Sequence, residues 1–397
     1  MKKEDWGIYF HIPFCERRCN YCDFFSTAGF GFEKIEQYFS YLSREFELFA
    51  RSVDKRAVHV HSIYFGGGTP SYAPASEITS LLSKILTEFD ITESIEITVE
   101  VNPHSALKET LSAYREAGVN RLSIGVQSLN PDELTILERI HSADDCFTTV
   151  ETARKTGFSN ISIDFIYGIP GQTMQSWKKT LEGAAAMQPE HVSAYMLMLE
   201  KGTKMTGLVQ SGGLPAPDED IVAEMYKHAH SYLEKSGYEH YEVSNFAKPG
   251  YASQHNVHYW KRKPYKGFGM SAHSYHNNTR SWNTTDFATY FNAIDNGTPP
   301  TEGSERLSLV QQINEEIMLR LRMRDGLSFR EFALQFGKHA ADILKQNINE
   351  FLQDKNTERY FHPAKRDETV RLTTQGFLVS DKIISQLFLD KSDFAAG

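Results

Sequence analysis

Cysteine is scarce in this sequence, with four among 397 residues. Three of them, Cys15, Cys19 and Cys22, lie in one short segment, which does not resemble the framework of a disulfide-stabilised protein. Long apolar runs are missing too, because no stretch of about eighteen apolar residues occurs that could cross a membrane. Residues 1–6 have no apolar core of a signal peptide. We therefore expect a reduced, cytoplasmic protein without a transmembrane segment, while peripheral contact with a membrane stays open because it needs no anchor.

Positive charge is in deficit as well. Lysine and arginine number 42 against 51 acidic residues, which gives a formal net charge of −9. General nucleic-acid binders are basic, so we expect no nucleic-acid partner. Hydrophobic residues make up 40% and aromatic residues 12% of the chain, a composition that excludes a largely disordered protein. The length indicates one large α/β barrel with an appendage, or about two to three ordinary domains.

The first half of the chain alternates between strand-like and helix-like segments. Strand-like runs are expected at 7–13, 61–65, 94–101, 121–126, 160–167 and 191–199. Helical spacing of apolar residues is found between them, at 32–51, 76–89, 107–117, 144–156 and 173–187, with a further helix start at 130–133. This alternation predicts parallel βαβ units with right-handed crossovers. The functional residues of such sheets lie at the carboxyl ends of the strands.

The second half of the chain is patterned differently. Residues 201–220 are rich in Gly, Pro and Ser and are expected to form a loop, and residues 238–260 are aromatic and polar without a clean period. After the boundary at 298–300, the expected elements are helices at 307–322, 328–335 and 340–352, a hairpin from 360–361 and 370–372, and a last helix near 378–389. This order describes a winged-helix-like unit, for which the acidic chain favours a lid or a protein-docking surface over DNA binding.

The expected fold class is therefore α/β: a partial (β/α)6 TIM-like barrel with a small C-terminal winged-helix-like α+β domain. We expect three domains, with the barrel core at 1–200, an extension at 201–300 and the C-terminal domain at 301–397.

The cysteine segment admits four interpretations. A structural zinc site would need a fourth ligand, for which His11 is the candidate. A thioredoxin-like pair of Cys19 and Cys22 would ignore Cys15 and lacks a helix start after the pair. An iron–sulfur cluster ligated only by protein would need Cys146, which lies inside an expected helix and is more typical of a small buried hydrophobe.

The remaining interpretation, which we favour, is a [4Fe–4S] cluster held by three thiolates. One iron is then open to a ligand that is not protein. Three thiolates within the eight residues of Cys15–Cys22 suit a cluster better than an apolar core. Tyr21, Phe24 and Phe25 could shield such a cluster from water, and the neighbouring residues 17–18 add two arginines beside an anionic cluster.

The spacing Cys-x3-Cys-x2-Cys after a first strand, with Tyr21 before the last cysteine, resembles the radical S-adenosylmethionine (SAM) superfamily. Within about residues 5–275, further stretches resemble its oxygen-independent coproporphyrinogen III oxidase-like branch. These stretches are Ile12-Pro13-Phe14-Cys15, Gly66-Gly67-Gly68-Thr69-Pro70, Glu100-Val101-Asn102-Pro103, Arg121-Leu122-Ser123-Ile124-Gly125-Val126-Gln127-Ser128 and Asp164-Phe165-Ile166-Tyr167-Gly168-Ile169-Pro170-Gly171. The resemblance implies a radical SAM barrel in which the open iron chelates the methionine part of SAM, and reduction of the cluster cleaves SAM to a 5′-deoxyadenosyl radical.

The same resemblance implies a set of site residues in this sequence. The cluster ligands would be Cys15, Cys19 and Cys22. The SAM-binding residues would be Tyr9, Gly67, Gly68, Thr69, Glu100, Gln127, Arg139, Asp164 and Met198. Glycines let the backbone approach the ligand without a Cβ clash, and an arginine fits a carboxylate through its planar fork.

Within this branch the sequence is more similar to the HemW-type heme chaperones than to the oxidases. The oxidases extend the motif with a fourth cysteine two positions after the third, where this sequence has Phe24, and they have a longer arm before the motif than the fourteen residues that precede Cys15. The segment His255-Asn256-Val257-His258-Tyr259-Trp260 resembles the His-Asn-x-x-Tyr-Trp signature of the chaperones.

The resemblance implies a protein that binds heme and passes it to an acceptor protein. His255 is the preferred ligand of the heme iron and His258 the alternative, although His255 could instead form only a hydrogen bond to a backbone carbonyl. The alternative function is a coproporphyrinogen III oxidase that forms protoporphyrinogen IX, and a non-enzymatic structural cluster protein is the third. The radical SAM machinery is complete, so the sequence leaves open whether the chain is an enzyme.

Overall fold

The computed structural model describes residues 3–362 and 369–394. Within these residues, one sheet of 12 strands runs through the larger part of the molecule. At the centre of the described sheet, six strands pair in parallel and in chain order: β1 (Glu4–Ile12), β4 (Val58–Gly67), β5 (Asp90–Val101), β6 (Arg121–Gln127), β7 (Ile161–Tyr167) and β8 (His191–Met196). The predicted α/β barrel of parallel units is confirmed.

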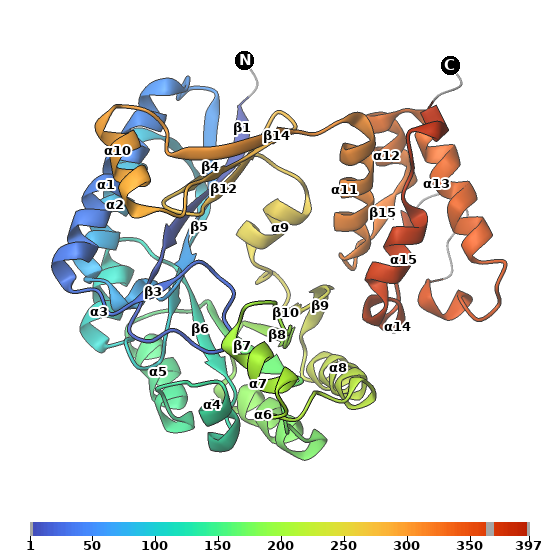
Figure 1. Cartoon of the computed structure of the whole chain (residues 1–397), viewed down its shortest axis with the longest axis horizontal. Helices are drawn as coiled ribbons and strands as arrows, with labels where there is room; N and C mark the ends of the chain where they lie inside the picture. The colour runs from blue at the N-terminus through green and yellow to red at the C-terminus, as the bar shows by residue number, and fades with distance from the viewer. Residues whose placement is uncertain (1–2, 363–368, 395–397) are drawn as a thin grey trace.

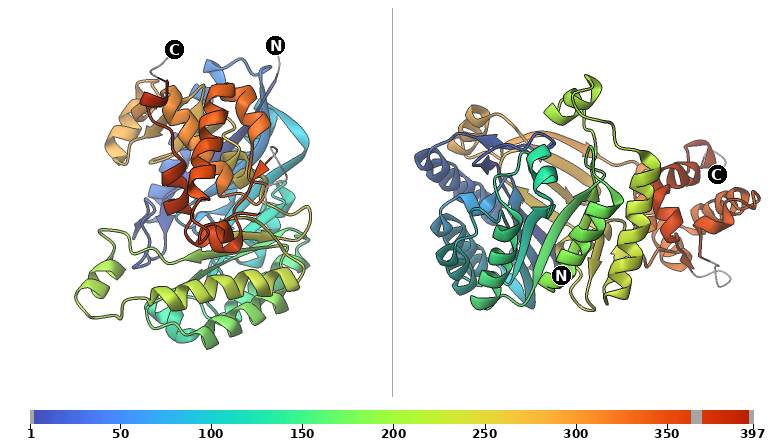
Figure 2. Two further views of the ribbon diagram at one scale, coloured as in Figure 1. Left: turned by 90° about the vertical axis from the view of Figure 1, so that its right-hand side faces the viewer. Right: turned by 90° about the horizontal axis from the view of Figure 1, so that it is seen from below.

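Helices connect these strands and cover the outer face of the sheet (Figures 1 and 2). They are α1 (Phe32–Ser52), α2 (Ala75–Glu88), α3 (Lys108–Glu116), α4 (Pro131–Ile136), α5 (Ala143–Lys155) and α6 (Met174–Met187). Polar side chains fix where the helices begin. The Asn130 side chain accepts a hydrogen bond from the first turn of α4, and Ser142 and Asp145 form a capping box on α5. The helix start predicted at 130–133 is confirmed.

The two faces of each parallel strand carry different side chains, because successive residues point to opposite faces. On β5, Ile97 and Val99 belong to the apolar core that packs against the helices, whereas Glu96 and Thr98 are buried polar residues of the other face. On β7, Asp164 lies between two core residues in the same way. The interior of the barrel is therefore polar, and the apolar core lies between the sheet and its helices.

Residues after β8 extend the sheet at both sides of the parallel core. Beyond β8 lie β10 (Asn245–Ala247) and β9 (Glu239–Glu242), both antiparallel to their neighbours. On the other side, β11 (Tyr265–Phe268) pairs in parallel with β1, and β12 (His273–His276), β13 (Thr279–Asn283) and β14 (Thr301–Arg306) follow in antiparallel order. The range 201–300, predicted as an extension, thus supplies strands to the barrel sheet, and the domain boundaries stay a prediction.

The chain crosses from one side of the parallel core to the other through α9 (Gln254–Trp260), which is drawn in yellow near the middle of Figure 1. This helix packs against the inner face of the sheet, since a Cβ atom built on Gly7 of β1 would lie 3.3 Å from the ring of His258 and 3.5 Å from that of His255. The aromatic, polar stretch without a clean period therefore folds as β9, β10 and α9.

One expected loop is wrong. Residues 201–220 contain the helix α7 (Lys204–Gln210), and α8 (Glu219–Lys235) follows. The composition rich in Gly, Pro and Ser favoured a loop over a helix. The helix has an N-cap, since the Thr203 side chain accepts a hydrogen bond from the backbone N–H of Thr206 at 3.3 Å. A helix of two turns needs only such a cap and one buried contact, and Met205 supplies the contact.

The C-terminal unit lies beside the barrel, at the right of Figure 1. The chain passes from α10 (Phe287–Asp295) through β14 into this unit. The described elements of the unit are α11 (Leu309–Leu321), β15 (Leu327–Ser328), α12 (Phe329–Phe336), α13 (Lys338–Phe351), η2 (Glu358–Tyr360), β16 (Thr369–Val370), α14 (Thr374–Leu378), α15 (Ser380–Leu387) and η3 (Ser392–Phe394). An antiparallel bridge between Phe361 and Leu372 confirms the expected hairpin contact. The last helix, predicted near 378–389, is confirmed as α15, and the short helix α14 before it was not predicted. In the described residues, no helix has the length and apolar character needed to span a membrane.

Candidate cofactor site

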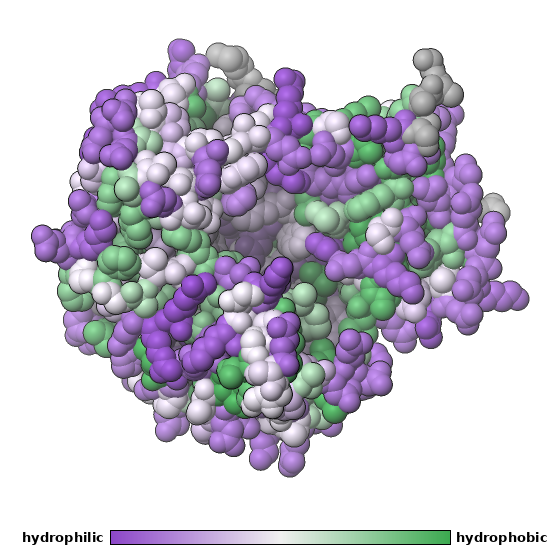
Figure 3. Space-filling model, viewed as in Figure 1, coloured by the Kyte–Doolittle hydropathy of each residue, from purple (hydrophilic) through white to green (hydrophobic). Residues whose placement is uncertain are grey.

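A cavity of about 580 Å³ opens at the carboxyl ends of the parallel strands. The cysteine loop, which follows β1 through the short strand β2 (Phe14–Cys15), forms one wall. The other lining residues come from the ends of β4 to β8, from the loops that follow these strands and, with Asn256, from α9. Seen from the side of Figure 1, the surface of the molecule is mostly polar and is hollowed near its centre (Figure 3). Functional residues of parallel α/β sheets gather at this end of the strands.

The three cysteines of the loop line the cavity together and form no disulfide. Cys15 is buried at the end of β2, and Cys19 and Cys22 are partly exposed. The Thr69 hydroxyl donates to Cys15 Sγ at 3.5 Å, and Arg139 Nη1 donates to Cys19 Sγ at 3.4 Å. The Cys22 thiol interacts with the backbone of Phe24 and the side chain of Ser26. Hydrogen-bond donors of this kind tune the potential of an iron–sulfur cluster.

Two of the alternative interpretations lose their fourth ligand. Both ring nitrogens of His11 are engaged, Nδ1 with the Tyr9 hydroxyl at 3.1 Å and Nε2 with the Phe25 carbonyl at 2.7 Å. Cys146 is fully buried in α5, where its thiol donates to the Ser142 carbonyl at 3.3 Å. Across residues 3–362 and 369–394, no group of three or more His, Cys, Asp or Glu side chains could hold a single metal ion. Ligation of an iron–sulfur cluster by the three cysteines stays a prediction.

The glycine run after β4 forms the wall next to the cysteines. Gly67 has a φ of +115°, and a Cβ atom there would lie 2.6 Å from the His11 ring. A Cβ atom on Gly68 would lie 3.0 Å from Cys15 Sγ and 2.8 Å from the Phe14 carbonyl oxygen. Only glycine is compatible with both positions, and the result is a stretch of bare backbone beside the cluster ligands.

Two partly buried carboxyl groups face the cavity from the ends of β5 and β7, on either side of β6. Glu100 accepts hydrogen bonds from the Tyr64 hydroxyl at 2.8 Å and from the Gly67 N–H at 3.1 Å. Burial, reinforced by the charge of Asp164, raises the pKa of Glu100 to about 7. Asp164 accepts from three serine hydroxyls, Ser193 at 2.6 Å, Ser123 at 2.8 Å and Ser162 at 3.1 Å. Burial raises the pKa of Asp164, and the serine hydrogen bonds oppose that rise.

Gln127 and Arg139 meet where β6 ends. Gln127 has a φ of 66°, a left-handed conformation that is uncommon outside glycine and costs energy. Arg139 spans from Cys19 to β6, because its Nη2 donates to the Gly125 carbonyl at 2.9 Å. Its Nε atom is buried without a hydrogen-bond partner. A Cβ atom on Gly125 would lie 2.9 Å from Gln127 Nε2, so a larger residue there would have to displace the end of the Gln127 side chain.

Most of the predicted SAM-binding residues are brought together by the fold. Those that line the cavity are Gly67, Gly68, Thr69, Glu100, Gln127, Arg139, Asp164 and Met198. Tyr9 is not among the lining residues; its ring stacks on Tyr64 with a centroid distance of 6.1 Å. Contact of these residues with SAM stays a prediction.

Sequence reasoning missed other residues that line the cavity. They include Tyr64, Arg121, Ser123, Ser193 and Asn256. The signal that could have found two of them is the period-two alternation of β6, which places Arg121, Ser123 and Gly125 on one face. No local pattern indicates that Asn256, which lies 92 residues after Asp164 in the chain (256 minus 164), reaches the same cavity.

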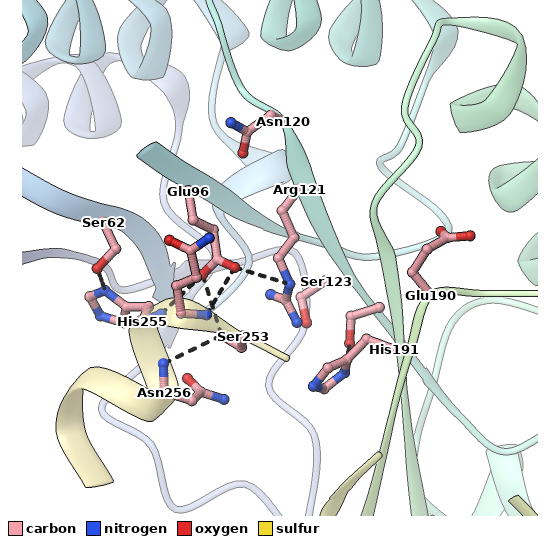
Figure 4. A network of polar contacts seen from close by, with 12 residues as sticks. Ser62, Glu96, Asn120, Arg121, Ser123, Glu190, His191, Ser253, His255 and Asn256 are labelled. Carbon is pink, nitrogen blue, oxygen red and sulfur yellow. Dashed lines mark hydrogen bonds and ion pairs between the residues drawn. The ribbon is translucent and has the colours of Figure 1, made fainter. Parts of the chain in front are cut away.

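His255 is not among the residues that line the cavity, and Figure 4 shows it beside Ser62 and Glu96. Its Nδ1 is hydrogen-bonded to the Ser62 hydroxyl at 2.8 Å and its Nε2 to the Tyr259 hydroxyl at 2.8 Å. The ring stacks on Tyr64 with a centroid distance of 5.0 Å, and burial lowers its pKa well below the ordinary value. Heme ligation by His255 stays a prediction, and it would require one of the two hydrogen bonds to be released. The Nε2–H of the alternative ligand His258 donates to the Pro264 carbonyl at 2.7 Å.

Two family models match the chain. The model of the Radical SAM superfamily matches residues 9–184, and that of the HemN C-terminal domain matches residues 307–379.

Curated proteins and a solved structure are similar over nearly the whole chain. The heme chaperone HemW of Lactococcus lactis subsp. lactis (strain IL1403) is 35% identical over 397 residues, which cover 99% of this chain and 100% of that protein. The heme chaperone HemW of Bacillus subtilis (strain 168) is 35% identical over 379 residues, or 95% of this chain and 97% of that protein. The structure of coproporphyrinogen III oxidase (HemN) from Escherichia coli matches with a TM-score of 0.84 over 98% of this chain and 90% of that chain, at 23% identity, which shows a shared fold.

Proposed function

The chain belongs to the radical SAM superfamily and, within it, to the HemW family, and we propose that it is a heme chaperone that holds a [4Fe–4S] cluster and SAM. The observation that carries the proposal is the similarity to HemW proteins across 95% or more of the chain. The acceptor of the heme is a further protein, and we place the exchange in the cytoplasm.

The cluster would be held by Cys15, Cys19 and Cys22. When bound and reduced, such a cluster supplies the electron that cleaves SAM. The chain's own residues prepare the place for it. Thr69 and Arg139 aim hydrogen-bond donors at two of the three sulfurs, and Gly68 leaves the space beside Cys15 Sγ that any side chain would fill. These features agree with the donor set that the family implies.

SAM would occupy the cavity next to the cluster ligands. The bare backbone at Gly67 and Gly68 permits close approach of the methionine part, and Arg139 offers a cation for its carboxylate. Glu100 on β5 and Asp164 on β7 supply carboxyl oxygens to the same cavity. Because burial raises the pKa of Glu100 to about 7, its ionised form, which accepts the stronger ligand hydrogen bond, predominates only above neutral pH.

Apolar side chains exposed at the mouth of the cavity support heme binding. Phe24 is 71% exposed and Met198 55% exposed, and Tyr195 and Met196 lie beside them among the lining residues. Exposed apolar side chains that border a polar cavity are typical of a ligand-binding surface, and the flat, apolar face of a porphyrin would cover them. Iron ligation by His255 remains a prediction of this proposal, with His258 as the alternative.

The oxidase alternative is not favoured. The full-length relatives named above are heme chaperones, and the match to the oxidase structure concerns the fold. Phe24 stands where the oxidases have a further cysteine. Decarboxylation of coproporphyrinogen III is therefore not expected.

The proposal is tested with the full chain, reconstituted with iron and sulfide without oxygen. Titration with hemin should reach saturation with a defined heme spectrum, and incubation with coproporphyrinogen III, SAM and dithionite should yield no protoporphyrinogen IX. Protoporphyrinogen IX formed over multiple turnovers would replace the chaperone function by the oxidase. Formation of methionine and 5′-deoxyadenosine after reduction would exclude a purely structural cluster.

A further inference from the structure

Arg121 is a buried cation at the floor of the cavity. It begins β6, is 2% exposed and lines the cavity beside Ser123 and Asp164. Its Nε atom has no hydrogen-bond partner. The nearest acid, Glu96, places Oε2 4.0 Å from that Nε, an ion-pair distance that is too long for a hydrogen bond. A guanidinium has five N–H donors in a fixed fork. A buried guanidinium with an unpaired N–H indicates that a bound ligand completes its hydrogen bonds.

Glu96 does not complete Arg121, because its oxygens are taken by the segment around α9 (Figure 4). Oε1 accepts from the His255 N–H at 3.1 Å and from the Ser253 hydroxyl at 3.4 Å, and Oε2 accepts from the Gln254 N–H at 3.0 Å. These bonds fix Glu96 at the beginning of the helix. Arg121 is left with the charge of Glu96 at ion-pair distance and with its Nε unpaired, while the residue itself lines the cavity.

The charges around Arg121 define the class of ligand. Three carboxyl groups, Glu96, Glu100 and Asp164, surround this one cation, and Glu100 and Asp164 line the cavity with it. A second carboxylate or a phosphate at this floor would face those acids at close range and is disfavoured. A neutral group that both accepts and donates hydrogen bonds fits instead, since its oxygens can accept from Arg121 while its hydroxyl protons are donated to the carboxyl groups.

A vicinal diol has these properties. We propose that Arg121 binds the ribose diol of the nucleoside in the cavity, with its guanidinium donating to the diol oxygens and the facing carboxyl groups accepting the hydroxyl protons. The inference rests on the proposed function, because it takes SAM as the ligand, and it adds a binding residue that the sequence motifs did not assign.

The test compares SAM with its 2′-deoxy analogue by equilibrium dialysis on the cluster-loaded full chain. Wild type should prefer SAM. Arg121→Met should weaken SAM binding by about 10-fold to 100-fold, the usual cost of a lost charged hydrogen bond, and should bring the preference for the diol to about 1. Arg121→Lys keeps the charge without the fork and should retain only part of the preference. Arg56→Met serves as the matched control, because Arg56 is 90% exposed and pairs with Asp54, and it should bind both ligands like wild type.

The outcomes separate the inference from the proposed function. Failure of wild type to bind SAM would remove the proposed function itself. Wild-type binding with no preference for the diol would overturn the inference alone. So would an Arg121→Met variant that binds SAM normally, or one that loses affinity but keeps the full preference. If circular dichroism shows Arg121→Met to be unfolded, Arg121→Lys decides, and an unchanged preference in that variant contradicts the inference.

Discussion

The cysteine loop and the segment around α9 are both short stretches of residue types that bind metals, and they are built in opposite ways. The loop leaves its sulfurs with contacts of 3.4 and 3.5 Å and two of its cysteines partly exposed. In the α9 segment, His255 is 1% exposed and both ring nitrogens make hydrogen bonds of 2.8 Å. A ligand must have a free lone pair, so the loop is ready for a metal and the α9 segment is already occupied by the protein.

The difference teaches how to weigh such motifs. Releasing a buried hydrogen bond leaves a partner unsatisfied, at a cost of about 1 to 3 kcal/mol, whereas the loop thiols have little to give up. Residue types that bind metals can therefore serve as ligands in one segment and stabilise the fold in another. The hydrogen-bond partners of their side chains distinguish the two roles.

The largest effect is expected at the loop. Cys15→Ala, Cys19→Ala and Cys22→Ala should each abolish nearly all cluster binding, because three thiolates leave none to spare. Iron and sulfide content and the visible absorbance of the reconstituted protein measure this. Cys146→Ala is the matched control, since Cys146 lies in the core, and it should retain the cluster. A loop variant that keeps its full iron content would show that the substituted cysteine is not a cluster ligand.

His255→Ala should lower the free energy of unfolding by about 2 to 5 kcal/mol, because two buried hydrogen bonds and the packing of the ring are lost together. Chemical denaturation measures the change, and the iron–sulfur absorbance of the folded protein should be intact. As the predicted ligand, His255 should also be needed for the full heme spectrum. An unchanged heme titration would exclude His255 as the ligand. Loss of heme binding with an unchanged free energy of unfolding would show that His255 is available to bind iron, like the loop cysteines, and does not stabilise the fold.

A smaller effect concerns pH. Below its raised pKa of about 7, Glu100 is mostly protonated and loses the negative charge that strengthens a hydrogen bond from the ligand. The affinity for SAM should therefore fall as the pH drops below 7, by at most about tenfold per pH unit, and should level off above pH 7. Glu100→Gln should remove this dependence. Isothermal titration calorimetry between about pH 6 and 8 measures it, and an equal slope in both proteins would exclude Glu100 as the titrating group.

The smallest effects sharpen the comparison with a matched pair. Ser62→Ala removes the hydrogen bond to His255 Nδ1 and should cost about 1 to 3 kcal/mol of stability, because a buried nitrogen is left unsatisfied. Thr69→Val removes the long contact to Cys15 Sγ and should cost less than about 1 kcal/mol. Thermal unfolding of the two variants side by side gives the ranking, and the reverse order would show that the loop is the more tightly built region.

The local sequence pattern predicted the parallel units well, because βα alternation is written in the spacing of apolar residues. The alternation of residues 94–101 becomes the end of β5, and the glycines after β4 become the bare wall beside Cys15. The cluster loop was equally accessible, since its cysteines are close in the chain.

Long-range placement was not accessible in this way. Nothing local indicates that β11 would pair with β1, with Gly267 opposite Tyr9, or that the chain would pass through the barrel to get there. In the sequence, Arg121 is recognisable only as the first residue of a family-like stretch. Its surroundings depend on Glu96, which precedes it by 25 residues (121 minus 96). Glu96 is in turn held in place by hydrogen bonds from the start of α9. Site residues that act through such partners become visible only in three dimensions.

The passage of the chain through α9 also has a mechanical side. Residues 248–264 run without interruption from β10, beside β8, to β11, beside β1, so they tie the two flanks of the parallel core to each other by a tether of fixed length. The tether is anchored midway, at Glu96 on β5. The girth of the barrel cannot change without stretching this tether or pulling it off its anchor. A ligand too large for the cavity must therefore be met at the rim, where Phe24 and Met198 stand, and cannot be admitted by spreading the strands.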